Sequence, residues 1–249
     1  MNKQLLNSFL FHPRKSTQVA NQNDIFIEVD RSIHVSARLH LENQNFPTII
    51  FFHGNGEIVT DYDMIGKEYN RRGINFIIVD YRGYGFSSGE PTSLNILSDS
   101  IEIFHYLENR LDKKYFQKIF IMGRSLGSTC ALEISYHLSN KIHGIIIESG
   151  FVNEDPLFSL IGINKEHINF KEEDGFLNEK KIKNYFGPLL VIHAKEDHII
   201  PFHHGKLLLT LCPSKNKKLI PMYEANHNNI LDNNYHNYFK EIELFVYSN

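Results

Sequence analysis

The sequence predicts an α/β fold, in which about eight strands form one mainly parallel sheet with helices on both faces. From residue 47 onward, segments with strand character alternate with segments of helical periodicity. Several strand segments are continuous apolar runs, which are typical of parallel strands buried on both faces. One such run ends in Gly123-Arg124-Ser125-Leu126-Gly127, a Gly-x-Ser-x-Gly sequence at a strand-to-helix turn.

The first two strands are expected at 24–30 and 33–41, where apolar residues alternate with polar ones, as in an antiparallel edge pair with one face in solvent. Six more strands are expected at 47–53, 74–80, 118–122, 142–148, 189–194 and 217–223. Helices are expected at 58–72, 93–110, 126–138 and 202–211, with a last helix to about residue 246. This order predicts a single domain over residues 1–249, with a surface lead-in at 1–23 and a small cap insert at 153–187.

The composition indicates a soluble globular chain without a nucleic-acid partner. Of 249 residues, 42% are hydrophobic and 22% charged, and the net charge is −3. No window approaches the roughly 20 apolar residues of a membrane-spanning helix, and the N-terminus lacks a signal-peptide pattern, so we expect a cytoplasmic protein with no integral membrane segment. Cys130 and Cys212 have neither disulfide nor metal-ligand spacing, so no metal or other cofactor is expected. Cys130 is predicted to be a buried packing residue.

Ser125 is the candidate nucleophile. A strained turn between a strand and a helix lifts a serine hydroxyl clear of the backbone. Gly123 and Gly127 leave room where the strand and the helix cross. A serine that only caps a helix needs no such glycines, so the nucleophilic role is favoured over a cap.

Asp197 and His227 are the candidate acid and base. Polar residues that follow parallel strands meet at the carboxyl edge of the sheet, and here they occur in the order Ser, Asp, His. The serine needs an imidazole to accept its proton, and the imidazole needs a carboxylate to orient it. Glu196 is an alternative acid, and Glu148 and Asp155 are more distant ones. The alternative bases are His193, His198, His203 and His236.

Two backbone N–H groups are expected to stabilise the oxyanion of an acyl-transfer reaction. Leu126 contributes one from the start of its helix, and Asn55 contributes the other from the loop after strand 47–53. Gly54 and Gly56 allow this loop to approach the substrate closely. His53 is expected to be structural and to pack beneath the loop.

Other residues near the site have less specific predictions. Arg124 is expected in a surface salt bridge, with substrate contact as the alternative. Tyr84, in the glycine-rich loop 81–91, is expected to pack that loop, although Tyr84 and Phe86 could instead line the cleft. The insert 153–187 is short and charged, which predicts a small helical flap and a fairly open site rather than a large lid.

Five motifs together resemble the α/β-hydrolase superfamily, from about residue 46 to the C-terminus. They are His-Gly-Asn-Gly-Glu at 53–57, Asp-Tyr-Arg-Gly-Tyr-Gly-Phe-Ser-Ser-Gly-Glu-Pro-Thr at 80–92, Gly-Arg-Ser-Leu-Gly at 123–127, His-Ala-Lys-Glu-Asp at 193–197 and Ala-Asn-His-Asn at 225–228. The chain looks most like bacterial serine hydrolases of unassigned substrate. It is also similar to eukaryotic α/β-hydrolase-domain proteins that remove palmitate from protein cysteines.

The resemblance implies an α/β-hydrolase fold and the same assignments: Ser125 as nucleophile, Asp197 as acid, His227 as base, and Asn55 with Leu126 as oxyanion donors. The chain departs from the pattern at Ala194 and Asn226, where such proteins usually carry glycine. Asn tolerates left-handed backbone better than most residues, so we do not expect Asn226 to displace the histidine.

The expected function is hydrolysis of a carboxylic ester or thioester through an acyl-serine intermediate. The substrate is expected to be a small-molecule acyl ester or thioester, with an acylated protein as an alternative. There are two competing hypotheses. The first is a serine peptidase or amidase, and the second is a ligand-binding protein on the hydrolase scaffold that has lost catalysis. The complete set of Ser125, Asp197 and His227 argues against lost catalysis.

Overall fold

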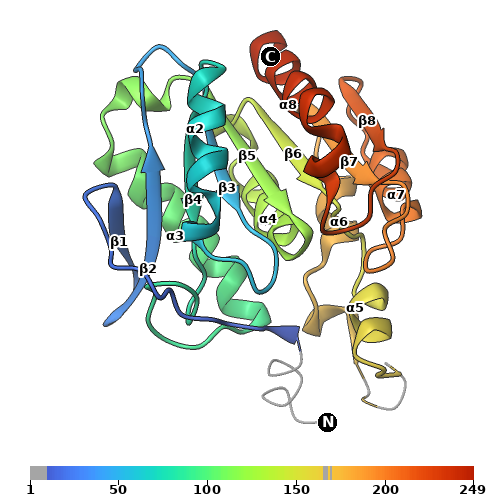
Figure 1. Cartoon of the computed structure of the whole chain (residues 1–249). Coiled ribbons are helices and arrows are strands. Elements are labelled where there is room, and N and C mark those ends of the chain that lie inside the picture. Colours follow the sequence, from blue (N-terminus) through green and yellow to red (C-terminus); the bar gives the residue numbers. More distant parts are fainter. Residues whose placement is uncertain (1–9, 165–167, 169) are drawn as a thin grey trace.

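The computed structural model describes residues 10–164, 168 and 170–249, and its centre is an eight-stranded sheet of order β1-β2-β4-β3-β5-β6-β7-β8 (Figure 1). The strands are β1 (Asp24–Asp30), β2 (Ile33–His40), β3 (Thr48–Phe52), β4 (Asn75–Val79), β5 (Ile119–Arg124), β6 (Gly144–Glu148), β7 (Leu189–Ala194) and β8 (Lys217–Met222). β2 pairs antiparallel with β1 and β4, and the strands from β4 to β8 are parallel. The predicted sheet is therefore confirmed, with every strand boundary within two residues of its expected position.

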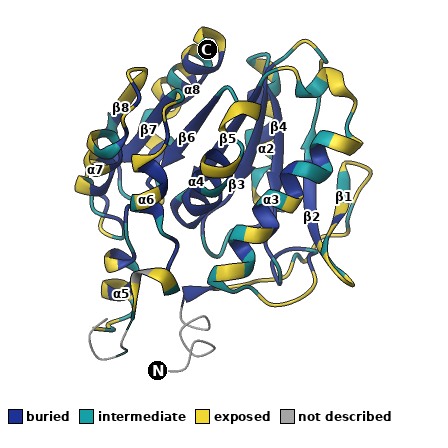
Figure 2. Ribbon diagram, turned by 180° about the vertical axis from the view of Figure 1, so that it is seen from behind, coloured by how far each residue is buried: buried dark blue, intermediate teal, exposed yellow. Residues whose placement is uncertain are grey.

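Helices cover both faces of this sheet. One face carries α2 (Asp63–Arg71) and α8 (Ile230–Ser248), which lie in front in Figure 1. The opposite face, seen in Figure 2, carries α3 (Ser93–Arg110), α4 (Ser128–His137), α6 (Asn178–Lys183) and α7 (His203–Leu211). A separate cluster of buried apolar side chains fills each layer, since the central strands contribute residues to both sides.

Short 3₁₀ turns precede two of the helices that the periodicity predicts. η1 (Val59–Tyr62) precedes α2, and η3 (Ser125–Gly127) precedes α4. The insert between β6 and β7 contains α5 (Asp155–Leu160), η6 (Glu172–Asp174) and α6, and 165–167 and 169 of the predicted cap lie outside the described residues. Two further 3₁₀ turns are η2 (Lys113–Phe116) and η4 (Ser139–Lys141).

The N-terminal segment is more deeply embedded than its polar sequence predicts. Residues 1–9, with part of the expected lead-in, lie outside the described residues, but Leu10 and Phe11 are only 7% and 3% exposed. The next residues run beside the loop after β4, where Gly85 N–H donates to Arg14 O at 2.9 Å and Ser16 N–H donates to Gly85 O at 3.2 Å. We call residues 10–16 the N-terminal strap. No helix among the described residues has the length and apolarity needed to cross a bilayer.

Candidate active site

Ser125 lies in a strained turn at the carboxyl end of β5. Its φ angle is +50°, a left-handed value that non-glycine residues rarely adopt. The flanking glycines are sterically required: a Cβ on Gly123 would lie 2.2 Å from the carbonyl oxygen of Gly127, and a Cβ on Gly127 would lie 2.0 Å from that of Phe52. The turn therefore has the geometry of a nucleophile elbow.

The loops after β7 and β8 bring an acid and a histidine to this serine. The Oγ of Ser125 lies 3.0 Å from Nε2 of His227, and Nδ1 of His227 lies 2.8 Å from Oδ2 of Asp197. A carboxylate only accepts hydrogen bonds, so Nδ1 carries the proton and the lone pair of Nε2 faces the serine hydroxyl. All three residues are buried, with exposed fractions of 6%, 3% and 7% in the order Ser, His, Asp. This is the arrangement in which an imidazole can accept a serine proton.

The charge of Asp197 is stabilised on both carboxylate oxygens. Oδ1 accepts the backbone N–H groups of Ile199 at 3.0 Å and Ile200 at 2.8 Å, while Oδ2 faces His227. Burial opposes the charge, but the hydrogen bond from His227, the electrostatic interaction with that residue and the backbone hydrogen bonds outweigh it and hold the pKa of Asp197 below its ordinary value. Glu196, the alternative acid, is exposed and accepts the backbone N–H of Ala225 at 3.0 Å.

Among the described residues, His227 is the histidine that hydrogen-bonds to Ser125. His193 donates from Nε2 to the carbonyl oxygen of Ile200 at 2.8 Å, and burial lowers its pKa. This bond supports the same loop that holds Asp197. His193 is therefore a neighbour of the acid, and the structure does not bring the other alternative bases, His198, His203 and His236, into hydrogen-bond contact with the serine.

The two expected oxyanion donors lie in different structural settings. Leu126 is in η3, directly after the serine, while Asn55 is in the turn that follows β3. Among the described residues, no loop or turn hydrogen bond engages either backbone N–H group. The side chain of Asn55 is engaged at both its oxygen and its nitrogen: Oδ1 accepts from the Tyr84 hydroxyl at 2.5 Å and from His12 N–H at 2.9 Å, and Nδ2 donates to Leu10 O at 2.8 Å. The N-terminal strap thus fixes this turn, a role that the sequence pattern did not indicate.

His53 packs beneath this turn, as predicted, and Tyr84, predicted to pack the loop 81–91, contacts the ring of Tyr81 in that loop as well as the ring of His53. His53 is fully buried, with Nε2 at 3.1 Å from Oδ1 of Asp80, and the Tyr84 ring is also fully buried. Phe86 is partly buried and packs against the apolar cluster of the α2 and α8 face. Cys130 is fully buried in the other cluster, as predicted.

The prediction for Arg124 is wrong about its location. It does form salt bridges, but its side chain is only 11% exposed and it pairs with Glu57 and Glu148 beneath the surface. These partners lie 67 and 24 residues away in sequence, so no local pattern could identify them. Glu148 thus pairs with a guanidinium and does not contact His227 as an acid would. Asp155, the other distant alternative, begins α5.

Among the described residues, no group of three or more His, Cys, Asp or Glu side chains is placed to hold a metal ion.

The fold and the site together define an α/β hydrolase. The sheet is eight-stranded and mainly parallel, and an elbow serine and a histidine–carboxylate pair lie at the same edge of it. A family model described as "Serine aminopeptidase, S33" matches residues 43–168. The chain belongs to this family of α/β-hydrolase-fold serine hydrolases.

Curated relatives include lysophosphatidylserine lipase ABHD12 of Xenopus tropicalis, which is 29% identical over 67% of this chain and 47% of its own. Human alpha/beta hydrolase domain-containing protein 17B is 29% identical over 80% of this chain and 66% of its own. The chain thus spans about half the length of the first relative and about two thirds of the second. This similarity agrees with the expected likeness to eukaryotic α/β-hydrolase-domain proteins.

Solved structures show the same fold at low sequence identity. The Pyrococcus furiosus esterase Pf2001 superposes with a TM-score of 0.78 at 16% identity, over 95% of this chain and 98% of its own. Est1E from Butyrivibrio proteoclasticus superposes with a TM-score of 0.72 at 17% identity, over 91% of this chain and 98% of its own. The predicted α/β-hydrolase fold is confirmed.

Proposed function

We propose that this protein hydrolyses carboxylic esters or thioesters through an acyl-serine intermediate. The observation that carries the proposal is the continuous series from Ser125 Oγ through His227 to Asp197, with separations of 3.0 and 2.8 Å. A serine hydroxyl is a weak nucleophile at neutral pH, and an adjacent imidazole that accepts its proton activates it. The low pKa of Asp197 keeps its carboxylate charged opposite the imidazolium that forms.

During acylation a proton moves from Ser125 to His227, and His227 then passes it to the leaving group. The Oγ of Ser125 attacks the acyl carbon while its proton passes to Nε2 of His227, and the carbonyl oxygen becomes an oxyanion. The backbone N–H groups of Leu126 and Asn55 donate to that oxyanion. The bond to the leaving group then breaks, and His227 returns the proton to the departing alcohol or thiol.

Deacylation repeats these roles with water as the nucleophile. His227 accepts a proton from water as the water oxygen attacks the acyl carbon of the acyl-serine. Collapse of the second oxyanion releases the carboxylic acid, and the proton returns to the Oγ of Ser125. No cofactor enters this sequence of steps.

The cavity beside His227 supports an acyl group of small or medium size. It has a volume of about 300 Å³, and its lining includes Tyr62 and Ile65 as well as His227. The named relatives include a lipase of lysophosphatidylserine, which supports an ester as the scissile group. An acylated protein is the alternative substrate, since an open cleft would admit a bulky leaving group.

Peptide or amide hydrolysis is the second candidate, and the family description "Serine aminopeptidase, S33" favours it. The same nucleophile and base would serve both reactions. Turnover of a panel of aminoacyl-p-nitroanilides, compared with p-nitrophenyl esters and acyl thioesters of increasing chain length, separates the two. Amide turnover without ester turnover would favour the peptidase.

A fluorophosphonate probe tests the mechanism directly. We expect the probe to label the wild-type protein at Ser125, and Ser125→Ala to abolish labelling and p-nitrophenyl acetate hydrolysis, because loss of the nucleophile costs on the order of a million-fold in turnover. Ser135→Ala is the matched control. Ser135 is a buried serine of α4 whose hydroxyl donates to Leu132 O at 2.9 Å, so its loss should leave labelling intact. Undiminished esterase activity in Ser125→Ala would refute the mechanism.

A further inference from the structure

The partly buried guanidinium of Arg124 joins the residue before the proposed nucleophile to the loop that carries the proposed base. Arg124 precedes Ser125, and its Nη2 donates to the backbone carbonyl oxygen of His227 at 2.6 Å. This contact is made to the main chain of the histidine, whereas its imidazole bonds to Ser125 and Asp197. Arg124 therefore contacts the same residue that hydrogen-bonds to Ser125.

The same guanidinium reaches the turn expected to provide an oxyanion donor. Its Nη1 donates to Oε1 of Glu57, and Oε2 of Glu57 accepts the backbone N–H of Gly54 at 2.7 Å. Gly54 is bonded to Asn55, whose N–H is the expected donor. A Cβ on Gly54 would lie 2.5 Å from Nη1 of Arg124, so the absence of a side chain at Gly54 is what admits the guanidinium.

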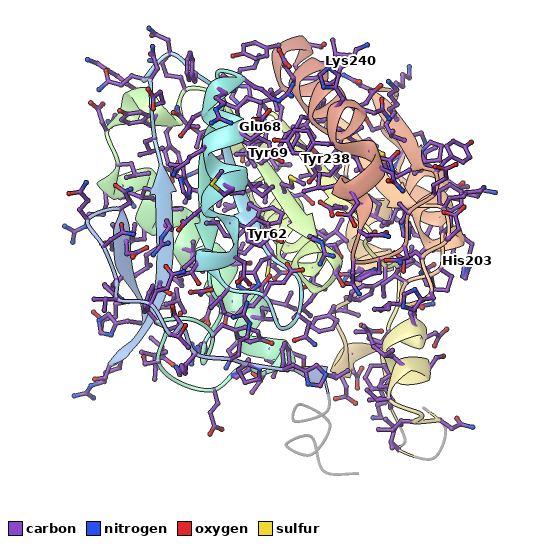
Figure 3. All side chains as sticks on the ribbon, in the orientation of Figure 1. Tyr62, Glu68, Tyr69, His203, Tyr238 and Lys240 are labelled. Carbon is purple, nitrogen blue, oxygen red and sulfur yellow. The ribbon has the colours of Figure 1, made fainter. Side chains whose placement is uncertain are left out.

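Two tyrosines hydrogen-bond to the carboxylates that pair with this guanidinium. The Tyr62 hydroxyl donates to Oε2 of Glu57 at 2.6 Å, and the Tyr238 hydroxyl donates to Oε2 of Glu148 at 2.6 Å. Nε of Arg124 donates to Oε1 of Glu148 at 3.1 Å. Figure 3 shows that Tyr62 lies at the start of α2 and Tyr238 on α8, on the same face of the sheet. The Arg124 guanidinium thus has three acceptors on three separate segments, and each carboxylate has a further donor.

We propose that Arg124 is a positioning residue that sets the separation of the base and the oxyanion turn from Ser125. We call Arg124 and its acceptors Glu57, Glu148 and the His227 carbonyl the arginine clamp. A planar guanidinium presents several N–H donors in fixed directions, whereas an ammonium is a point charge, so arginine suits three acceptors in one plane better than lysine does. The proposal rests on the proposed function, because the clamp acts through the groups assigned there.

Steady-state kinetics with p-nitrophenyl acetate tests the clamp. We expect Arg124→Met to lower kcat by about 100-fold, because misplacement of reacting groups by about 1 Å costs that much, while KM changes little. Arg124→Lys keeps the charge, and we expect it to remain folded yet to recover less than about a tenth of the lost kcat. Should Arg124→Met fail to fold, the lysine variant alone decides, since full kcat in Arg124→Lys overturns the proposal.

Arg72→Met is the matched control for the loss of a partly buried, ion-paired arginine. Arg72 donates to Glu68 at 2.9 Å and to Glu243 at 3.3 Å, near the end of α2 opposite the active-site edge. We expect it to lower the melting temperature while kcat per folded molecule stays within about twofold of wild type. Equal kcat in wild type and Arg124→Met overturns the clamp alone. A wild-type protein without turnover and without probe labelling overturns the proposed function, and the clamp with it.

Discussion

At the scale of single residues, the carboxylate of Asp197 is oriented so that one oxygen accepts backbone N–H groups and the other faces the imidazole of His227. Oδ1 accepts from Ile199 and Ile200, so Oδ2 is left for Nδ1 of His227. This division fixes the histidine tautomer, because an acceptor at Nδ1 requires the proton on that nitrogen. The lone pair of Nε2 is then available to Ser125.

Replacement of this acid by its amide tests the assignment. In Asp197→Asn the backbone donors hold the amide oxygen, so the amide NH₂ faces Nδ1 of His227 and favours the tautomer protonated on Nε2, which cannot accept the serine proton. We expect kcat to fall by about 10⁴-fold with little change in fold. Steady-state ester hydrolysis with circular dichroism measures both. Glu196→Gln is the control, and a larger loss there than in Asp197→Asn would transfer the role of the acid to Glu196.

The sequence located these chemical groups better than it located the residues that support them. Ser125, Asp197 and His227 each follow a strand, and parallel strands bring such residues to one edge, so their proximity was predictable. The burial of Arg124 was not predictable, since it depends on Glu57 and Glu148, which only the folded sheet brings together. A charged residue beside the nucleophile resembles a surface residue until its partners are known.

At the scale of elements, strands were more predictable than helix starts. Continuous apolar runs identify buried strands, and the boundaries follow from the polar residues that flank them. The helix after the elbow was expected from Leu126, but α4 begins at Ser128, because the left-handed conformation of Ser125 forces the chain through the turn η3 first. The N-terminal strap was missed because its role depends on contacts with distant turns and hardly at all on its own periodicity.

The Asn55 side chain joins the N-terminal strap to the turn after β3, and mutation of this residue tests that connection. Asn55→Ala removes the bonds to Leu10 O, His12 N–H and the Tyr84 hydroxyl, so we expect the turn to loosen, kcat for p-nitrophenyl acetate to fall by about tenfold, and stability to fall by about 2 kcal/mol. Steady-state kinetics and urea unfolding measure these effects.

Tyr84→Phe is the matched partial variant. It removes the hydroxyl, which donates to Asn55 and accepts from His12 N–H at 3.0 Å, but keeps the buried ring and the bonds from Asn55 to Leu10 and His12. Its effect on kcat should be smaller than that of Asn55→Ala. An Asn55→Ala protein with wild-type kcat would show that the strap does not support the oxyanion turn.

At the scale of the whole molecule, buried and partly buried histidines are spread along the chain and couple stability to pH. Burial is the main cause that lowers the pKa of each of four histidines: His40, His143, His193 and His204. In the unfolded chain these side chains bind protons near pH 6.5. Below that pH the unfolded state therefore holds more protons than the folded state, and the free energy of unfolding falls as the pH decreases.

His204 provides the sharpest test of this coupling. Burial lowers its pKa to about 4, with the neighbouring His203 and His193 adding to the effect, so its contribution to stability is complete above about pH 6.5 and is lost as the pH falls toward 4. Thermal unfolding across this range should show a falling melting temperature, and His204→Gln should lessen the fall by about 5 °C. The glutamine carbonyl can still accept from Val152 N–H, which donates to Nδ1 of His204 at 3.3 Å.

Two carboxyl groups oppose this trend. Burial raises the pKa of Glu148 and of Asp99, so each binds its proton more readily in the folded state and favours folding as the pH falls. Both proteins share this contribution from Glu148 and Asp99. It therefore cancels when the melting temperature of His204→Gln is compared with that of wild type. His137→Gln, a change at an exposed histidine of α4, is the control and should run parallel to wild type. A His204→Gln protein whose melting temperature follows the wild-type curve from pH 7 to pH 4 would exclude His204 as a source of the acid sensitivity.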